Sequence, residues 1–189
     1  RKEVHELRHQ YMAIMVGSQT VLDDDPMLNC RLIEGKDPIR VIVDSSLRIP
    51  MTARLVKTAR DIRTIVACTP SADEKKIKDL QNAGVEVLII EMKDGHVDLK
   101  KLTEELGRMQ IDSILLEGGA TLAAAAFEAG IVDKVQMYIA PKIIGGITAR
   151  TPVGGNGVEH LSDAWQLKDI TARNIGNDIC ITGYIRREA

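Results

Sequence analysis

Two arginines in this sequence are candidates for binding a phosphorylated ligand. Arg8 and Arg31 flank the short apolar run 11–16 and the polar segment that follows it. Two guanidinium groups on one side of such a segment could bind one phosphate through paired hydrogen bonds. Each arginine taken alone is more often a surface charge. Their pairing is therefore a hypothesis about where a substrate phosphate binds.

A second candidate is the segment Leu116–Leu122, which reads LEGGATL. Gly118 and Gly119 carry no Cβ atom, so the backbone can approach a phosphate closely there. A helix that begins at residue 120 would favour the same anion through its N-terminal N–H groups and its dipole. The segment matches neither G-x-G-x-x-G nor a Walker A sequence, and a tight strand-to-helix turn explains it equally well. Glu117, directly before the glycines, would face the same crevice.

Acidic side chains follow the first apolar run. Residues 20–26 read TVLDDDP, and we expect an acidic turn that Pro26 closes. The three adjacent aspartates lack the alternating spacing of a calcium loop, which argues against a metal site. We interpret Asp23 as a solvated turn residue, whereas Asp24 and Asp25 are candidates for a role at the end of the strand.

A polar turn follows the second apolar run, residues 39–44. It contains Asp44, Ser45, Ser46 and Arg48. Hydroxyl groups and an arginine at the end of a strand could hold the 2′-phosphate of a nucleotide. A plain turn accounts for the same residues equally well, so both interpretations stay open at this point.

The histidines and cysteines indicate no further catalytic site. His5 and His9 stand four residues apart, but no third metal ligand is evident, and a solvated helix face is the commoner explanation. The cysteines are odd in number and far apart in the sequence, which favours a reducing compartment and hence the cytoplasm. The sequence contains no G-x-S-x-G and no Cys–His signature. We therefore predict no bound metal and no nucleophilic hydrolysis.

The composition excludes several classes of protein. The chain has 189 residues, enough for one domain, and 44% of them are hydrophobic. A net charge of −2 argues against a basic surface for nucleic acid. An aromatic content of 3% argues against modules that stack bases. No apolar run approaches the roughly 20 residues of a membrane span, so we expect no membrane partner.

Apolar runs alternate with helix-like segments along most of the chain. We expect strands at 11–16, 39–44, 63–68, 85–91, 112–116 and 133–140. We expect helices near 1–10, 73–83, 98–107 and 120–129. Residues 141–163 contain five glycines and two prolines and are interpreted as an irregular loop.

The runs 165–173 and 178–186 flank Gly176-Asn177, which is a hairpin signal. The whole pattern predicts an α/β fold with a mostly parallel central sheet flanked by helices. The C-terminal hairpin would add antiparallel strands at an edge of this sheet. Ligands of such sheets bind beyond the carboxyl ends of the strands, where the candidate residues stand.

Four segments, taken in order, resemble one family. They read LRHQYMAIMVGSQTVLDDDPMLNCRL (7–32), PIRVIVDSSLRIP (38–50), ILLEGGATLAAAAFEAGIVDKV (114–135) and YIAPKIIGG (138–146). Together they resemble the reductase domain of riboflavin biosynthesis. In bacteria this domain is the C-terminal half of the bifunctional diaminohydroxyphosphoribosylaminopyrimidine deaminase/reductase. The resemblance covers nearly the whole chain and implies a dihydrofolate-reductase-like fold and a homodimer or larger homo-oligomer.

The resemblance implies an oxidoreductase that uses NADPH to reduce the ribosyl group of 5-amino-6-(5-phosphoribosylamino)uracil. Positions that match NADPH contacts are Thr20, Asp24, Ser45, Gly119, Ala120, Thr121, Leu122, Ala123, Ala124 and Ala125. Positions that match contacts to the phosphorylated pyrimidine substrate are Arg8, Leu28, Arg31 and Glu117. We expect direct hydride transfer to C1′ of the ribose, assisted by Asp24 or Glu117 as the catalytic carboxylate.

The sequence departs from the family at its N-terminal end. Relatives carry an additional strand upstream, followed by a Ser-x-Trp-type segment, and bacterial relatives carry a zinc-dependent deaminase domain before it. We expect residues 1–189 to be a single reductase domain that lacks both, so that zinc belongs only to the absent domain. Two alternatives stay open. One is a monofunctional 2,5-diamino-6-ribosylamino-pyrimidinone 5′-phosphate reductase; the other is a catalytically silent nucleotide-binding domain.

Overall fold

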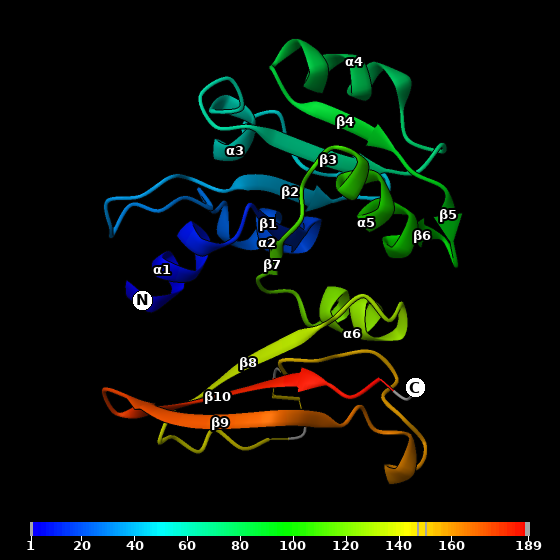
Figure 1. Cartoon of the computed structure of the whole chain (residues 1–189). Coiled ribbons are helices and arrows are strands. Elements are labelled where there is room, and N and C mark those ends of the chain that lie inside the picture. The colour runs from blue at the N-terminus through cyan, green and yellow to red at the C-terminus, as the bar shows by residue number, and fades with distance from the viewer. Residues whose placement is uncertain (1, 147, 150, 188–189) are drawn as a thin grey trace.

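The computed structural model describes residues 2–146, 148–149 and 151–187. Its upper layer in Figure 1 is a parallel sheet with the strand order β4-β3-β2-β1-β7. The strands are β1 (Ala13–Gly17), β2 (Ile39–Val43), β3 (Thr64–Cys68), β4 (Glu86–Ile89) and β7 (Ile114–Leu116). The helices are α1 (Lys2–Gln10), α2 (Ser18–Asp24), α3 (Arg54–Lys57), α4 (Glu74–Asn82), α5 (Leu99–Arg108) and α6 (Ala120–Glu128).

The central strands β1, β2 and β3 are largely buried because most of their residues are apolar. Ile14 of β1 packs into one cluster with Leu80 of α4, together with residues of α2 and α3. Its neighbours Ala13 and Met15 point to the opposite face and pack with Leu102 of α5 and with residues of α6. This alternation follows from the two-residue repeat of a strand. The predicted α/β fold with a parallel sheet between helices is confirmed.

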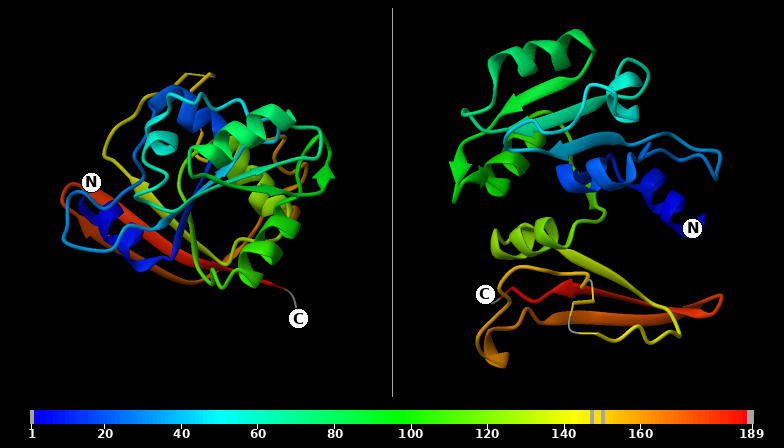
Figure 2. Two further views of the ribbon diagram at one scale, coloured as in Figure 1. Left: turned by 90° about the horizontal axis from the view of Figure 1, so that it is seen from above. Right: turned by 180° about the vertical axis from the view of Figure 1, so that it is seen from behind.

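The C-terminal hairpin is also confirmed, but its position differs from the prediction. Strands β9 (Leu167–Ile175) and β10 (Asp178–Ile185) join β8 (Lys134–Ile139) in a separate antiparallel sheet with the order β8-β10-β9. Figures 1 and 2 show α1 and α6 between this sheet and the parallel sheet. In the described residues, β7 pairs only with β1, and β8 pairs only with β10. The hairpin therefore extends β8 and adds nothing to the parallel sheet.

Residues 18–24 form helix α2 where an acidic turn was expected. Gly17 before it is extended, Val21 is buried, and Asp25 ends the helix in the left-handed region with φ 39°. The acidic residues lie at the C-terminus of the helix, which the helix dipole disfavours. Arg54 offsets this, because its backbone N–H donates to Asp25 at 2.8 Å and its guanidinium lies 3.3 Å from the same carboxylate.

Four further short elements were not predicted. Helix α3 is one turn long, and β5 (Met92–Lys93) pairs with β6 (His96–Val97) around Asp94-Gly95, both in the left-handed region. In the described part of the predicted loop 141–163, a 3₁₀ helix spans Leu161–Asp163. Within the described residues, none of the helices combines the length and apolar character needed to cross a membrane.

Strand β2 contains a fully buried arginine that joins three parts of the chain. Arg40 donates from Nε to the Thr64 hydroxyl at 2.9 Å and from Nη1 to the Thr58 hydroxyl at 2.8 Å. Its remaining hydrogen bonds go to the backbone carbonyls of Met27, Leu55, Thr58 and Ile62. No carboxylate is among these partners, and burial lowers the pKa of Arg40 to about 10. The side chain fixes the segments on either side of β2.

Candidate active site

The carboxyl ends of neighbouring parallel strands bring the predicted site residues to one edge of the sheet. Because β7, β1 and β2 are adjacent and parallel, the residues after them follow one another along this edge. Glu117 follows β7, Ser18 follows β1, and Asp44 with Ser45 follows β2. This is the position at which open α/β sheets bind ligands.

Arg8 and Glu117 form a two-bond ion pair. Arg8 donates from Nε and Nη2 to the two carboxylate oxygens of Glu117 at 2.8 and 2.9 Å. The backbone N–H of Glu117 donates to the Met15 carbonyl at 2.9 Å, which holds the residue against the end of β1. The side chains are 12% and 28% exposed, respectively. Two parallel bonds in a partly buried place fix the carboxylate in one orientation.

Asn29 forms hydrogen bonds with both Arg8 and Arg31, the two arginines predicted to bind one phosphate. Nη1 of Arg8 donates to the Asn29 carbonyl at 3.1 Å, and Nη1 of Arg31 lies 3.4 Å from the Asn29 side-chain oxygen. Leu28 before it has φ 50°, and its side chain is buried in the core. Leu28 therefore shapes the backbone that presents Asn29 and cannot offer its side chain to a ligand. Sequence reasoning did not identify Asn29, because no motif marks a bridging amide.

His5 lies behind this cluster, buried on the inner side of α1. It is 4% exposed, and its Nδ1 atom has no hydrogen-bond partner among the described residues. Burial lowers the pKa of His5, and the positive charges of Arg8 and Arg31 lower it further. His9 instead accepts the Lys36 N–H at Nδ1 at 3.0 Å, so the two histidines have separate environments.

The glycine turn is open to solvent and lies beside α2. Gly118 and Gly119 have φ values of 84° and 85°, and both are exposed. A Cβ atom on Gly119 would lie 3.6 Å from the Thr20 hydroxyl oxygen, so the structure places Thr20 next to the turn. The N–H of Ala123 donates to the Gly119 carbonyl at 2.9 Å. The N–H groups of the residues before it in α6 lack such intrahelical acceptors and remain for an anion.

The other residues predicted to contact the cofactor, 120–125, differ from one another in their exposure to solvent. Leu122 and Ala124 are buried, whereas Thr121 is exposed. The segment Gly154-Gly155 covers this part of α6, since the Gly154 N–H donates to the Ala120 carbonyl at 2.9 Å. A Cβ atom on Gly155 would come within 2.9 Å of the Ala124 Cβ. The side chains of Leu122 and Ala124 therefore take part in packing, whereas the side chain of Thr121 is open to solvent.

Ser45 and Asp24 lie in different surroundings. The Ser45 hydroxyl oxygen accepts the Val97 N–H at 3.1 Å, and its carbonyl accepts the Thr69 N–H at 3.1 Å. Ser45 thus lies where β2, β3 and β6 meet. Asp24 is exposed at the end of α2, and its side chain makes no hydrogen bond or ion pair with the described residues. Of the two candidate catalytic carboxylates, Glu117 is the one that contacts another predicted site residue.

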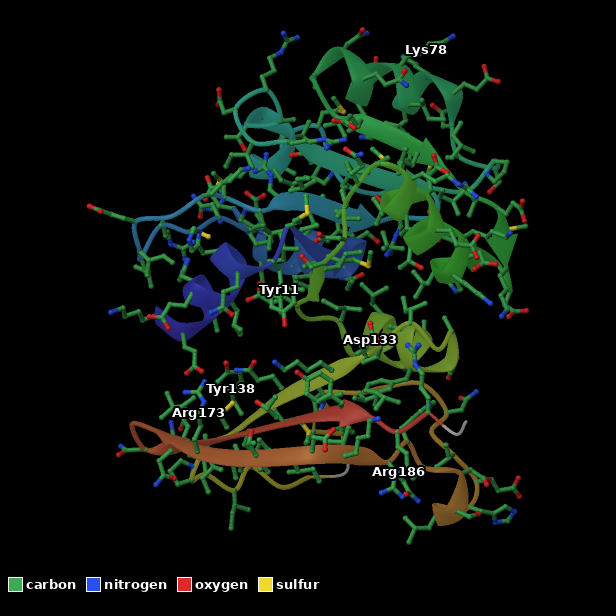
Figure 3. The ribbon with its side chains drawn as sticks, viewed as in Figure 1. Tyr11, Lys78, Asp133, Tyr138, Arg173 and Arg186 are labelled. Carbon is green, nitrogen blue, oxygen red and sulfur yellow. The ribbon has the colours of Figure 1, made fainter. Side chains whose placement is uncertain are left out.

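A polar hollow of about 310 Å³ lies between α1 and the three-stranded sheet. Glu3, Tyr11 and Arg173 line it, and Glu3 forms an ion pair with Arg173. In Figure 3, Tyr138 and Arg173 lie on the three-stranded sheet, and Tyr11 lies above them. Neither Arg8 nor Glu117 lines this hollow, so it is separate from the candidate active site.

Comparison with known proteins identifies the family. The model of the RibD C-terminal domain matches residues 1–181. The riboflavin biosynthesis protein RibD of Actinobacillus pleuropneumoniae is 48% identical over 181 residues, which are 96% of this chain and 48% of the relative. The 2,5-diamino-6-ribosylamino-4(3H)-pyrimidinone 5′-phosphate reductase of Methanothermobacter thermautotrophicus is 37% identical, over 95% of this chain and 82% of the relative. The chain thus spans about half the length of the RibD relative.

Solved structures agree with this result. Acinetobacter baumannii RibD superimposes with a TM-score of 0.82 at 28% identity, covering 98% of this chain and 50% of that one. The riboflavin biosynthesis reductase Rib7 of Saccharomyces cerevisiae gives 0.77 at 27% identity, covering 98% and 80%. The resemblance inferred from the sequence motifs is confirmed. This chain belongs to the RibD C-terminal domain family.

Proposed function

We propose that this chain carries the NADPH-dependent reduction of the ribosyl group of 5-amino-6-(5-phosphoribosylamino)uracil to the ribitylamino product in riboflavin biosynthesis. The observation that carries the proposal is the Arg8–Glu117 ion pair directly before the open Gly118-Gly119 turn. A carboxylate held in one orientation thereby lies beside a backbone suited to a phosphate group. The names of the relatives support the same reaction.

The basic side chains of the site have different parts in binding the substrate. Arg8 already pairs with Glu117, so most of its charge is neutralised locally. Arg31 is exposed and forms no ion pair with a carboxylate among the described residues. A guanidinium without an acidic partner is the stronger ligand for a phosphate dianion. Arg31 therefore binds the substrate phosphate, while Arg8 and Asn29 position the groups around it.

The residues at the glycine turn fit the pyrophosphate of a dinucleotide. Gly118 and Gly119 expose their backbone, and the first N–H groups of α6 point out of the helix end. Thr20 adds a hydroxyl at the same place. When bound, NADPH supplies the hydride, whereas the protein supplies position and electrostatics. Holding the reacting carbon atoms within about 3–3.5 Å is the main contribution of such a site.

We assign to Glu117 the control of the positive charge and of the proton on the reacting nitrogen of the substrate. The sugar must be ring-opened, as an imine conjugated to the aminouracil, before C1′ can accept a hydride. Reduction of this imine to the ribitylamine would need a hydride at C1′ and a proton on the attached nitrogen. The Glu117 carboxylate stabilises the cationic form of the imine. Asp24 is exposed and lies outside the ion-pair cluster, so we assign it to cofactor binding.

A runner-up substrate is the 2,5-diamino pyrimidinone that has not been deaminated. The Methanothermobacter relative carries that name and matches over 82% of its length. We favour the deaminated substrate because the RibD relative has the higher identity, 48% against 37%. Both substrates belong in the same assay, and the ratio of their kcat/KM values decides between them.

The experiment follows NADPH absorbance with each substrate and identifies the product by mass spectrometry. The proposal predicts turnover of the deaminated substrate and a mass gain of two hydrogens. NADPH binding without turnover of either substrate would favour a silent nucleotide-binding domain. In the same assay, the Arg108→Gln variant, at an exposed ion pair on α5, is the matched control for the Arg31→Ala variant of the site.

The proposal includes a homo-oligomer and a reducing compartment. Ile139 of β8 and Ile179 of β10 are paired across the two strands, and both are exposed apolar residues, which supports burial of this face against a second copy. Cys30, Cys68 and Cys180 are buried thiols, which suits the cytoplasm. Light scattering of the purified protein tests the assembly; a single protomer mass at micromolar concentration would contradict it.

A further inference from the structure

We propose that His9 of α1 is a positioning residue for Arg31, because it holds the loop that carries Arg31 against the helix that carries Arg8. The inference rests on the proposed role of Arg31 in binding the substrate phosphate. It goes beyond that role, since it names the contact that determines where Arg31 lies. The sequence suggested only a solvated helix face for His9, whereas the structure gives its ring a partner in this loop.

The Arg31 loop, residues 30–37, is closed at its base. The Cys30 N–H donates to Oδ1 of Asp37 at 2.7 Å, which joins the first residue of the loop to the last. The Cys30 thiol is buried and lies 3.6 Å from the His5 carbonyl of α1, to which it donates. Most of the residues between Cys30 and Asp37 are exposed. The base of the loop is therefore fixed, and the part that carries Arg31 extends toward solvent.

His9 contacts the second half of this loop. Its Nδ1 atom accepts the Lys36 N–H at 3.0 Å, so the neutral ring carries its proton on Nε2. A Cβ atom on Gly35 would lie 2.7 Å from Nδ1 and 2.9 Å from Cγ of His9, so the Gly35 backbone packs directly against the ring. Among the hydrogen bonds of the described residues, the bond to His9 alone joins residues 31–36 to a helix or strand.

Helix α1 thereby positions both arginines of the proposed phosphate site. Arg8 precedes His9 on this helix and is fixed by its two bonds to Glu117. Arg31 has only a hydrogen bond of 3.4 Å to the Asn29 side chain, so its place depends on the loop. Figures 1 and 2 show the segment before β2 beside α1. Two guanidinium groups bind one phosphate only when their separation matches it, and the contact with His9 maintains that separation.

Calorimetric binding of the phosphorylated substrate, without cofactor, tests the inference. His9→Ala removes the acceptor and the ring, so we expect the affinity to fall about three- to tenfold. His9→Asn keeps an acceptor oxygen two bonds from Cβ, as Nδ1 is, and should restore most of this loss. Affinities for the dephosphorylated substrate and for NADPH should stay within about twofold of the wild type. His160→Ala is the matched control, because this exposed histidine caps no helix with its side chain.

Gly35→Ala tests the same contact from the side of the loop. Gly35 lies outside the left-handed region, so the added methyl group meets the His9 ring without straining the backbone. We expect a loss of substrate affinity similar to that in His9→Ala. In the His9→Ala background the ring is gone, and Gly35→Ala should change the affinity by less than about twofold. His9→Ala should likewise add no further loss to Arg31→Ala, because His9 acts through Arg31.

Amide hydrogen exchange follows the contact without any ligand. The Lys36 N–H should exchange faster in His9→Ala, whereas the Cys30 N–H, which donates to Asp37, should keep its rate. A wild-type protein that does not bind the substrate would overturn the proposed function together with this inference. An unchanged substrate affinity in His9→Ala, or an equal further loss in the Arg31→Ala background, would overturn this inference alone. Urea unfolding of each variant verifies that the folded protein is being titrated.

Discussion

Arg8 on α1 and Glu117 after β7 are 109 positions apart in the sequence, yet they share two hydrogen bonds of 2.8 and 2.9 Å. The pair joins the N-terminal helix to the carboxyl edge of the parallel sheet. Because both carboxylate oxygens are engaged, Glu117 has one orientation relative to the glycine turn. This relationship makes α1 part of the candidate active site.

The ion pair should contribute to both stability and turnover. Glu117→Gln leaves Arg8 without a carboxylate, so we expect kcat to fall at least about tenfold, with a smaller change in NADPH affinity. A double-mutant cycle with Arg8→Gln should give a coupling free energy of about 1–2 kcal/mol in urea unfolding. The control Glu105→Gln removes an exposed partner of Arg108 and should change kcat by less than twofold. An unchanged kcat in Glu117→Gln would remove this carboxylate from the mechanism.

Arg31 should affect substrate affinity with little effect on stability. Its exposed side chain makes one long hydrogen bond to Asn29, so Arg31→Ala should change the free energy of unfolding by less than about 0.5 kcal/mol. The KM for the phosphorylated substrate should rise about 10- to 100-fold through loss of a charge-assisted contact. Steady-state kinetics with the dephosphorylated substrate supplies the control, because there the variant and wild type should agree. Equal KM values for the phosphorylated substrate would exclude Arg31 as its anchor.

Two glycine substitutions should have opposite effects on stability. Gly119 has φ 85°, so Gly119→Ala should destabilise the protein by about 1–2 kcal/mol and weaken cofactor binding. Gly107 lies inside α5, and an added Cβ would have no atom within 4 Å. Gly107→Ala should therefore stabilise the fold by about 0.5–1 kcal/mol. Chemical unfolding and cofactor titration test both, and a stabilising Gly119→Ala would refute the assigned backbone constraint.

His5 should make the fold sensitive to mild acid. Burial and the nearby arginines lower its pKa below the ordinary value of 6.5, so the unfolded chain binds a proton that the folded chain resists. Its contribution to stability is therefore complete above pH 6.5 and falls as the pH drops from 6.5 toward the folded pKa. His5→Gln should flatten this part of the pH–stability curve, measured by urea unfolding between pH 5 and 7.5. A slope identical to that of the wild type would show that other groups cause it.

Substitution of Arg40 should lower the stability of the fold and leave the chemistry of the site unchanged. Arg40→Met removes six hydrogen bonds, to two threonine hydroxyls and four backbone carbonyls, in a largely buried place, so we expect a loss of about 3–5 kcal/mol. Arg40→Lys should restore part of it, because an ammonium group can serve only some of these acceptors. In the fraction that remains folded, NADPH affinity should match the wild type. A loss below 1 kcal/mol in Arg40→Met would contradict the assigned role.

Local patterns predicted the elements that depend on local chemistry. The apolar run before Gly17 and the Gly118-Gly119 turn were recognisable because burial on both faces and positive φ each demand particular residue types. Helix α2 was missed, since three successive aspartates disfavour a helix end unless Arg54, from a distant segment, offsets them. The hairpin at Asp94-Gly95 was also missed, although an Asp-Gly pair is typical of a two-residue hairpin turn.

Features that depend on tertiary contacts were beyond sequence reasoning. The pairing of Arg8 with Arg31 was proposed, but the bridge through Asn29 requires the left-handed backbone at Leu28. The location of the C-terminal hairpin depends on which strand edge it meets, and strand β8 provides that edge in a separate sheet. The exposure of residues 119–125 to a ligand depends on how much of them the segment Gly154-Gly155 covers, and this segment lies far away in the sequence.

Isotope transfer tests the central claim most directly. NADPH deuterated at the nicotinamide C4 position is incubated with the purified protein and 5-amino-6-(5-phosphoribosylamino)uracil, and the product is examined by mass spectrometry and NMR. Direct reduction predicts one deuterium at C1′ of the ribityl product, with a slower rate in Glu117→Gln but the same labelled position. Absence of ribityl product, or a product that carries solvent hydrogen at C1′, would contradict the proposed hydride transfer.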